Sequence, residues 1–249
     1  MIVFLTTATH RYTVKLLVED ELGAPVPRCR AVSYDTLFRA RRAPRATYVF
    51  TDLDRLRPWE LRVAAVFYRT LRQEGQRVLN DPAGAMQRLE LLRTLHDRGI
   101  NPFTAYPADA LPRPARFPVF LRDEDSHLIA WDELLPDQAA LDARLAALRA
   151  SGMPLRGLLV IEWAAEPIAP GIWRKYGTFR IGDAILVDSA VIEDRWLVKY
   201  GTIGLSTEAM QREEDAVVRG NLLAEAVRPA FALSGIEWGR ADHATVGGR

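Results

Sequence analysis

The basic side chains of this sequence are almost all arginine. Lysine occurs only at Lys15, Lys175 and Lys199, among 33 basic residues in all. Such a bias is typical of a GC-rich genome and needs no functional cause. It nevertheless predicts that a charge-carrying site in this protein is built mainly from guanidinium groups, which keep the charge of lysine but not its point-like geometry.

Other residue types that perform chemistry lack the spacing that their chemistry needs. The sequence has no P-loop, no dinucleotide-binding glycine motif, no nucleophile elbow and no His-Glu-x-x-His. Its four histidines are scattered, which argues against a histidine metal site. The one cysteine, Cys29, excludes an internal disulfide and a cysteine-built zinc site. Arginines flank it, but we expect it to serve packing rather than catalysis.

A short polar stretch follows the first predicted strand. Residues 6–10 read Thr-Thr-Ala-Thr-His and come directly after an apolar run. In an open parallel sheet, ligands bind beyond the carboxyl ends of the strands. This stretch is therefore one candidate for holding a phosphorylated ligand. The same residues are also typical of a plain turn from strand to helix, and both interpretations stay open.

Alternating strands and helices are predicted for the first third of the chain. Short β-rich runs at 2–6, 46–51 and 77–80 are separated by helical periodicity at 12–22 and 58–74. This alternation favours a parallel sheet that is covered on both faces.

The rest of the chain combines helices with a more β-rich pattern. We predict helices at 82–96, 137–150 and 207–234, the last broken at Pro229, and strands at 117–122, 157–163, 173–179, 184–187, 195–200 and 237–242. The turn at 180–183 joins two of these strands into a hairpin. Closely spaced prolines between 107 and 118 mark the best candidate for a linker.

Length and composition bound the class of protein. With 249 residues, 49% of them hydrophobic, the chain is globular and forms one large or two small domains. Its 33 basic and 32 acidic residues give no pull toward nucleic acid or an anionic membrane, so we expect neither as a partner. The sequence has no apolar run of transmembrane length and no signal-peptide pattern at its start. We expect a cytoplasmic protein, and a homodimer stays open.

Four stretches, taken in order, resemble the ATP-grasp family over nearly the whole chain from about residue 46. They read Val-Leu-Asn-Asp-Pro at 78–82, Phe-Pro-Val-Phe-Leu-Arg at 117–122, Trp-Arg-Lys-Tyr-Gly-Thr-Phe-Arg-Ile-Gly-Asp at 173–183 and Ile-Glu-Trp-Gly-Arg-Ala-Asp at 236–242. The resemblance rests on their order and spacing together.

This resemblance implies an α/β fold that is α+β in its C-terminal part. An N-terminal parallel-sheet domain of the pre-ATP-grasp type would occupy residues 1–106. A two-lobed ATP-grasp domain would follow at 107–249, with a small lobe at about 115–160 and a large lobe at about 161–249.

The family's activity is what the resemblance implies for function. Such enzymes bind ATP between two lobes, activate a carboxylate as an acyl phosphate and couple it to an amine or thiol. ATP and Mg²⁺ are thus the implied cofactors, and a small-molecule or peptide carboxylate is the implied substrate. The implied site residues are Arg174 and Arg180 for catalysis, Arg88, Arg122, Glu162, Lys175 and Lys199 for nucleotide binding, and Asp242 for the metal.

Two of these assignments carry a structural expectation. Arg88 is placed on a helix that begins at Pro82. A bulge at Gly177 would shift the strand register and bring Lys175 and Arg180 to the same face of the hairpin. Arg122 is also typical of an ion pair with Asp123 or Glu124, and the other cations are also typical of a solvated surface. Glu162 is also typical of a buried core strand.

The sequence departs from the family pattern in two places. An acidic stretch at 123–125 stands where the glycine-rich phosphate loop is expected, and the family's Glu-x-Asn metal strand would begin where this sequence ends. We expect either a piece of a longer active chain or a protein with weakened metal chemistry. Three functions stay open: a ligase, a catalytically silent ATP-binding module, or another α/β enzyme that uses a phosphorylated ligand.

Overall fold

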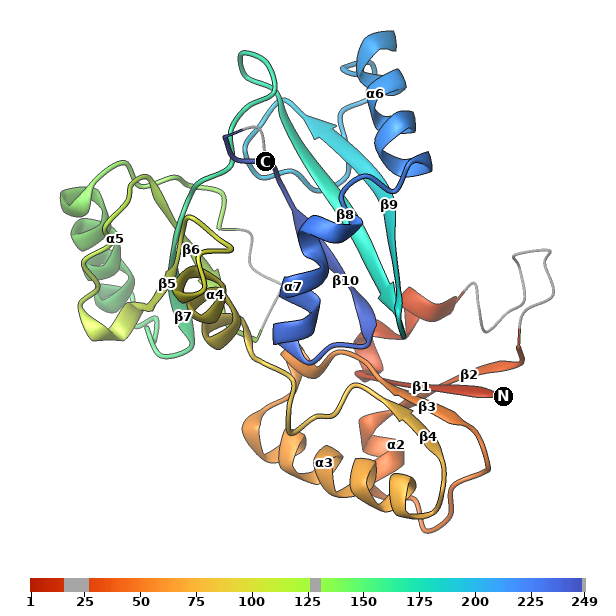
Figure 1. Ribbon diagram of the computed structural model, residues 1–249. Helices are drawn as coiled ribbons and strands as arrows, with labels where there is room; N and C mark the ends of the chain where they lie inside the picture. Colours follow the sequence, from red (N-terminus) through yellow and green to blue (C-terminus); the bar gives the residue numbers. More distant parts are fainter. Residues whose placement is uncertain (16–26, 126–130, 248–249) are drawn as a thin grey trace. The chain divides into compact units, whose positions relative to one another are not determined.

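The computed structural model describes residues 1–15, 27–125 and 131–247 (Figure 1). Contacts divide the chain into two compact units, Met1–Gln87 with Ser234–Gly239, and Arg88–Leu233 with Arg240–Arg249. The chain thus passes from the first unit to the second after Gln87, earlier than the domain boundary predicted between residues 106 and 107. That domain boundary stays a prediction.

The first unit is built on a parallel sheet with the strand order β2-β1-β3-β4. Its strands are β1 (Ile2–Thr6), β2 (Cys29–Ser33), β3 (Thr47–Phe50) and β4 (Arg77–Leu79). The two central strands carry apolar side chains on both faces, as expected of a sheet covered on both sides. The structure therefore confirms the predicted parallel sheet.

Helical segments connect these strands. They are η1 (Ala8–Val14), α2 (Tyr34–Phe38), η2 (Leu53–Arg55) and α3 (Pro58–Gln73). Pro58 opens α3 with a fixed φ angle, and the carboxylate of Glu60 accepts a hydrogen bond from the backbone N–H of Arg57. For the helix predicted at 12–22, the described part is the end of a 3₁₀ helix, and 16–22 lies outside the described residues.

Asn80 ties the return segment Ser234–Gly239 into the first unit. Its side chain is 2% exposed, and its Nδ2 donates to the carbonyl oxygens of Phe50 at 2.8 Å and Trp238 at 2.7 Å. Its Oδ1 accepts from the backbone N–H groups of Glu237 at 2.8 Å and Trp238 at 2.9 Å. Asn tolerates the left-handed φ of 62° found here better than most residues do.

The helix expected to begin at Pro82 is wrong at its start. The structure has a turn there, and α4 (Arg88–Asp97) begins six residues later. The carboxylate and carbonyl of Asp81 hold the turn. The N–H of Met86 then donates to the carbonyl of Ser234, so the return segment takes up a donor that the helix would have used.

The second unit contains an antiparallel sheet with the order β5-β7-β6. Its strands are β5 (Ala105–Pro107), β6 (Val119–Asp123) and β7 (Leu158–Glu162), with η3 (Ala108–Ala110) after β5. Leucines of α5 (Gln138–Ala150) bury one face of the sheet, and leucines of α4 pack against the other. Asp137 caps α5 by accepting from the N–H of Ala140 at 2.8 Å.

A second sheet in this unit has the order β10-β8-β9. Its strands are β8 (Trp173–Ile181), β9 (Ala184–Glu193) and β10 (Trp238–His243). Gly177 pairs with Ser189 and Thr178 pairs with Val187, so the extra residue of the bulge is Asp188 in β9. Alternation in β8 continues unbroken, and the expectation that Lys175 and Arg180 share a face is wrong.

Two further predictions in this region need correction. The strand predicted at 195–200 is irregular loop in the structure, because the Glu193 carboxylate draws the N–H groups of Lys199 and Tyr200 to itself. The helix predicted at 207–234 is two helices, α6 (Glu208–Arg219) and α7 (Ala224–Ser234). The break lies at Asn221, which has a φ of 52°, while Pro229 is accommodated inside α7.

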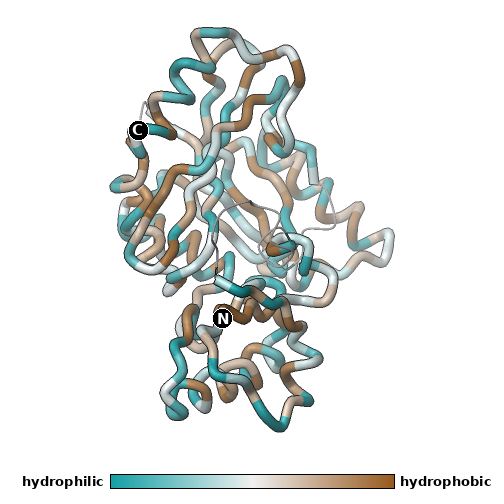
Figure 2. The backbone as a smooth tube through the Cα atoms, turned by 90° about the vertical axis from the view of Figure 1, so that its right-hand side faces the viewer, coloured by the Kyte–Doolittle hydropathy of each residue, from teal (hydrophilic) through white to brown (hydrophobic). Residues whose placement is uncertain are grey.

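Hydrophobic residues occur in short stretches along the whole described chain (Figure 2). None of the described helices is both long and apolar enough to cross a membrane.

Candidate functional site

Opposite charges gather on one face of the β10-β8-β9 sheet. Lys175 of β8 places its Nζ 3.2 Å from Oδ2 of Asp242 in β10, and Arg240 places its Nη1 2.9 Å from Oδ1 of the same carboxylate. The side chain of Asp242 is 47% exposed, that of Arg240 33% and that of Lys175 20%. We call Lys175, Arg240 and Asp242 the charged face; its groups are ordered by one another and remain accessible to solvent.

Gly177 provides the room for this arrangement. A Cβ atom at this position would lie 2.2 Å from Nη2 of Arg240, so the guanidinium occupies the space that a side chain would fill. The guanidinium is also held at the bulge, where its Nη2 donates to Oγ of Ser189 at 3.2 Å and its Nε lies 3.6 Å from Asp188. The bulge and the glycine together therefore position Arg240.

Arg174 projects from the opposite face of β8. It is 6% exposed, and its Nη1 donates to Oη of Tyr176 at 3.0 Å and pairs with Oε1 of Glu213 at 2.8 Å. Burial alone lowers the pKa of Arg174, but the hydrogen bonds to Glu213 and Tyr176 outweigh it and raise the pKa. The guanidinium is thus engaged with groups of the protein itself.

His243 lies on this buried face as well. Its Nε2 is 2.9 Å from Oγ1 of Thr178, and its ring stacks on Tyr176 at 5.8 Å. Burial lowers the pKa of His243, which favours the neutral imidazole.

Arg180, the second residue expected to be catalytic, holds the end of the hairpin. Its Nε donates to the carbonyl of Gly182 at 2.9 Å, and its Nη1 donates to the carbonyl of Phe231 in α7 at 3.2 Å. Neither Arg174 nor Arg180 is brought to the charged face, and their catalytic roles stay predictions.

Arg88 binds the end of β6, the strand that carries Arg122. Nη1 of Arg88 donates to the backbone carbonyls of Asp123 and Glu124, the two residues that follow Arg122. Phe120 packs on the α4 side and Leu121 on the α5 side, so alternation directs Arg122 toward the side of α4, where Arg88 begins the helix. The end of this strand therefore carries one arginine and is bound by another, which comes from a different element.

Glu162 at the end of β7 has its carboxylate occupied from within the chain. It is 3% exposed. Its Oε1 accepts from Oη of Tyr106 and from the N–H groups of Ala115 and Arg116, and its Oε2 accepts from the N–H of Thr104. The side chain thus fastens the proline-rich segment to the sheet, and its nucleotide role stays a prediction.

Lys199 sits in a loop that a second buried carboxylate organises. Oε1 of Glu193 accepts from the N–H groups of Lys199, Tyr200 and Gly201 at 2.6–2.9 Å, and its Oε2 accepts from Nε of Arg195. Burial raises the pKa of Glu193, but these hydrogen bonds outweigh it and lower the pKa to about 2. Lys199 is positioned through its backbone, and the structure leaves its phosphate role a prediction.

The structure thus brings Lys175 and Asp242 into contact, and it places Arg88 on the backbone carbonyls of the two residues after Arg122. Sequence reasoning missed Arg240, which joins Lys175 and Asp242. A signal for it was present, because Arg240 is two residues before Asp242 in a predicted strand and so shares its face.

The donor set around Asp242 does not make a metal site by itself. Among the described residues, no group of three or more His, Cys, Asp or Glu side chains is arranged to hold a metal ion. Both oxygens of Asp242 face cations. Mg²⁺ is usually bound by one or two carboxylates together with phosphate oxygens, so these residues alone do not fit a resident ion.

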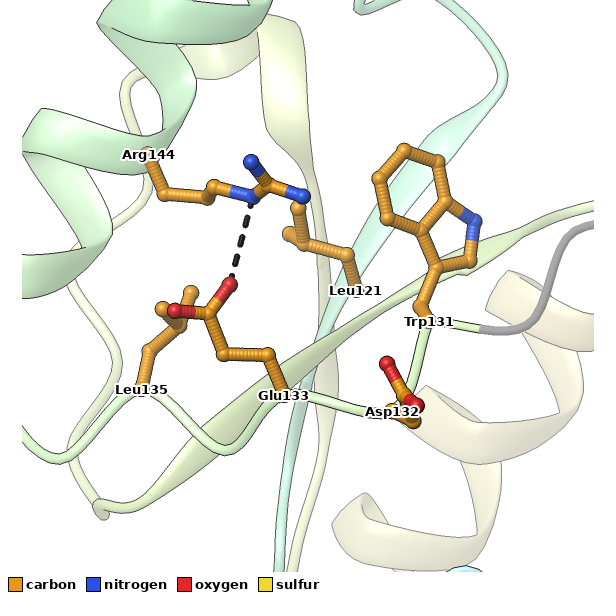
Figure 3. A pocket seen from close by; sticks show the side chains of 6 residues that line it. All are labelled: Leu121, Trp131, Asp132, Glu133, Leu135 and Arg144. Carbon is orange, nitrogen blue, oxygen red and sulfur yellow. Dashed lines mark ion pairs between the residues drawn. The ribbon is translucent and has the colours of Figure 1, made fainter.

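A separate cavity of about 90 Å³ lies between α5 and the start of the segment after residue 130. Its lining is Leu121, Trp131, Asp132, Glu133, Leu135 and Arg144, and Glu133 pairs with Arg144 at 3.4 Å (Figure 3). Ligand pockets for molecules of drug size enclose roughly 300–1,000 Å³, so this cavity is too small for a nucleotide.

No protein-family model matches this sequence, and no curated protein matches it at the sequence level. Solved structures do match. The RimK domain ATP-grasp protein from Sphaerobacter thermophilus is 18% identical with a TM-score of 0.54, and the match covers 99% of this chain and 87% of that one. The VanG D-Ala:D-Ser ligase from Enterococcus faecalis is 10% identical with a TM-score of 0.50, covering 99% and 86%.

The D-alanine–D-alanine ligase from Coxiella burnetii is similar to a comparable degree. It is 9% identical with a TM-score of 0.50, and the match covers 99% of this chain and 81% of the ligase. Matches at identities this low show a shared fold and no more. The same fold was expected from the order of the four stretches that resemble the ATP-grasp family. The chain has an ATP-grasp fold.

Proposed function

We propose that the protein is an ATP-dependent ligase that activates a carboxylate as an acyl phosphate for attack by an amine or thiol. The single observation that carries this proposal is the charged face, where Lys175 and Arg240 converge on Asp242 within an ATP-grasp fold. Two of the structural neighbours cited above are named as ligases, which supports the same reaction class.

The cations would serve the transfer of the terminal phosphoryl group. A triphosphate carries several negative charges, and cations that already lie in position stabilise the charge that develops as the carboxylate oxygen attacks the γ-phosphorus and ADP departs. Lys175 and Arg240 are oriented for this by Asp242 and by the space over Gly177. Phosphate oxygens would compete with Asp242 for the two cations.

Arg88 and Arg122 are a second pair of cations for the nucleotide. They come from a helix start and a strand end, so they satisfy the need for charge from more than one element. Guanidinium groups do not release protons in proteins, so all of these arginines stabilise charge and none acts as a base. We assign no step to Mg²⁺, since the described residues do not fit a resident ion.

A catalytically silent ATP-binding module is the second candidate. The observation that favours it is the lack of a complete metal site at the charged face, since the described residues form no group of three or more His, Cys, Asp or Glu side chains that could hold an ion. Such a protein would bind ATP and release no ADP. The substrate class, a small-molecule or peptide carboxylate, is part of the proposal in either case.

The experiment that tests the proposal is ADP release from ATP in the presence of carboxylate and amine mixtures, run on the wild type and Arg240→Ala. We expect ADP that depends on both substrates, and a loss of about tenfold to a hundredfold in the variant. Arg228→Ala is the matched control, because Arg228 is an exposed arginine paired with Glu225 on α7. ATP binding without ADP release would favour the silent module, and equal rates in all three proteins would contradict the assignment of Arg240.

A further inference from the structure

The parallel sheet of the first unit has a topological switch point between β1 and β3. The chain passes from β1 to its neighbour β2 on one side, and then returns to β3 and β4 on the other side. Connections that leave in opposite directions open a crevice beyond the carboxyl ends of the two strands, and open α/β sheets bind ligands there. The polar residues 7–10 follow β1, and Asp52 lies just after β3.

A histidine–aspartate pair spans this switch point. Nδ1 of His10 lies 2.6 Å from Oδ1 of Asp52. Oδ2 of Asp52 accepts from the N–H of Thr7 at 2.8 Å and from its Oγ1 at 3.1 Å. The side chain of Asp52 is 6% exposed and that of His10 is 19% exposed, so the carboxylate is enclosed while the imidazole reaches the surface.

Two other features set this edge apart from an ordinary turn. Asp52 has a φ of 56°, in the left-handed region where strained residues cluster at functional sites. The hydroxyl of Thr6, at the end of β1, is fully buried and has no hydrogen-bond partner among the described residues. Buried hydroxyls are rarely left without a partner, so an ordered water is the expected one.

The hydrogen bond to Asp52 determines which ring nitrogen of His10 can accept a hydrogen bond from a ligand. An ionised carboxylate only accepts hydrogen bonds, so Nδ1 of His10 carries the proton that is donated to Asp52. In the neutral ring Nε2 is then a lone-pair acceptor, as in the histidine of a catalytic triad. Two carboxylates also act on the neighbouring Tyr34: burial first, and then the charges of Asp52 and Asp54, raise the pKa of Tyr34 well above its ordinary value.

We propose that His10 and Asp52 form a binding site for the primary amine of a small molecule, and that His10 accepts its proton. A protonated amine would donate to Nε2 and be attracted by the carboxylates. Transfer of one proton converts the ammonium into a neutral amine with a free lone pair and the imidazole into imidazolium, whose charge Asp52 balances. The ligase proposed above uses an amine as one of its substrates. Identifying the amine bound at His10 with that substrate rests on the proposed function, whereas the binding site itself does not.

The test is nuclear magnetic resonance of the whole chain with ¹⁵N-labelled histidine, titrated with glycinamide in the absence of nucleotide. His10→Gln assigns the signal. His96 is the internal control, because it also lies beside an aspartate, 3.6 Å from Asp97, but on an exposed helix surface with 44% of its side chain accessible. Two control compounds are titrated in the same way: acetamide, which lacks the amine, and acetate, which is an anion.

We expect glycinamide to shift the side-chain nitrogens of His10 saturably and to leave His96 unchanged. Asp52→Asn keeps an oxygen acceptor for Thr7 but removes the charge, and should weaken the response at least about tenfold. No response of His10 up to about 100 mM glycinamide, a response to acetate instead, or an unchanged response in Asp52→Asn would overturn the proposal. Because the titration contains no ATP, its result is independent of whether the proposed ligase reaction is observed.

Discussion

Neighbouring residues of β8 show two different uses of a positive charge. Arg174 is buried, and its Nη1 donates a hydrogen bond to Tyr176 and pairs with Glu213. Lys175, the next residue, faces the other way and meets Asp242 at a partly exposed surface. Both side chains carry a positive charge, so what separates a structural cation from a candidate ligand-binding one is the face of the strand and the burial of the cation itself. The side chain of Arg174 is 4% exposed and that of Lys175 is 20% exposed.

The most severe way to break this comparison is to reverse a charge on the exposed side. Arg240→Glu would place a third carboxylate beside Asp242 and Asp188, where phosphates are proposed to bind. We expect ATP affinity to fall by more than about a hundredfold, measured by calorimetry. The melting temperature should change little, because Arg240 is 33% exposed; a protein that unfolds would instead show that the charged face is structural.

A second test concerns Glu193, a buried charged group that, like Arg174, is held by groups of the protein itself. We predict that its carboxylate makes the free energy of unfolding depend on pH. Its folded pKa of about 2 lies below the ordinary value of 4.5, so its contribution is present above pH 4.5 and is lost as the pH falls toward 2. The contribution is about 3 kcal/mol. Urea unfolding between pH 2 and pH 6 should show this loss in the wild type and not in Glu193→Gln. The same pH dependence in both proteins would contradict the role of Glu193.

A third test removes the buried cation. Arg174→Ala leaves the hydroxyl of Tyr176 without its donor in a buried position, and should lower the free energy of unfolding by about 2 kcal/mol. The affinity for ATP should stay within about twofold of the wild type once the protein is folded. Chemical unfolding together with an ATP titration checks both halves, and a binding defect without a stability defect would reverse the comparison.

The smallest expected effect comes from a single methyl group. Gly177→Ala pushes its Cβ into the guanidinium of Arg240, whose flexible side chain can move away at little cost in stability. We expect ATP binding to weaken about threefold while the free energy of unfolding changes by less than about 1 kcal/mol. Calorimetric titration of ATP into this variant measures how strongly ATP affinity depends on the position of the Arg240 guanidinium. An unchanged affinity would show that ATP binding does not depend on that position.

Much of the fold could be predicted because local patterns agree with the tertiary structure. The apolar runs of β1 and β3, the periodicity of α3 and the turn after β8 each indicate their element without help from distant residues. The late start of α4 could not be predicted, because the N–H of Met86 bonds to the carbonyl of Ser234 in the return segment, which Asn80 joins at a separation of 157 residues.

The same reasoning explains what was missed at the candidate site. The sequence does not show that Glu193 collects backbone N–H groups and prevents a strand, since that depends on a loop closing onto one carboxylate. It also does not show that the bulge residue belongs to β9, which separates Lys175 from Arg180. Arg240 went unnoticed although it lies two residues before Asp242 in a predicted strand, because the sequence does not show that the space over Gly177 brings its guanidinium to that carboxylate.

The central claim is that the exposed face of β8 and β10 binds nucleotide while the buried face supports the sheet. Calorimetric titration of ATP into the wild type, Lys175→Ala and Arg174→Ala, each with and without Mg²⁺, tests it most directly. We predict that Lys175→Ala loses at least about tenfold in affinity and that Arg174→Ala binds like the wild type. Equal affinities in all three proteins, or a loss confined to Arg174→Ala, would contradict the account.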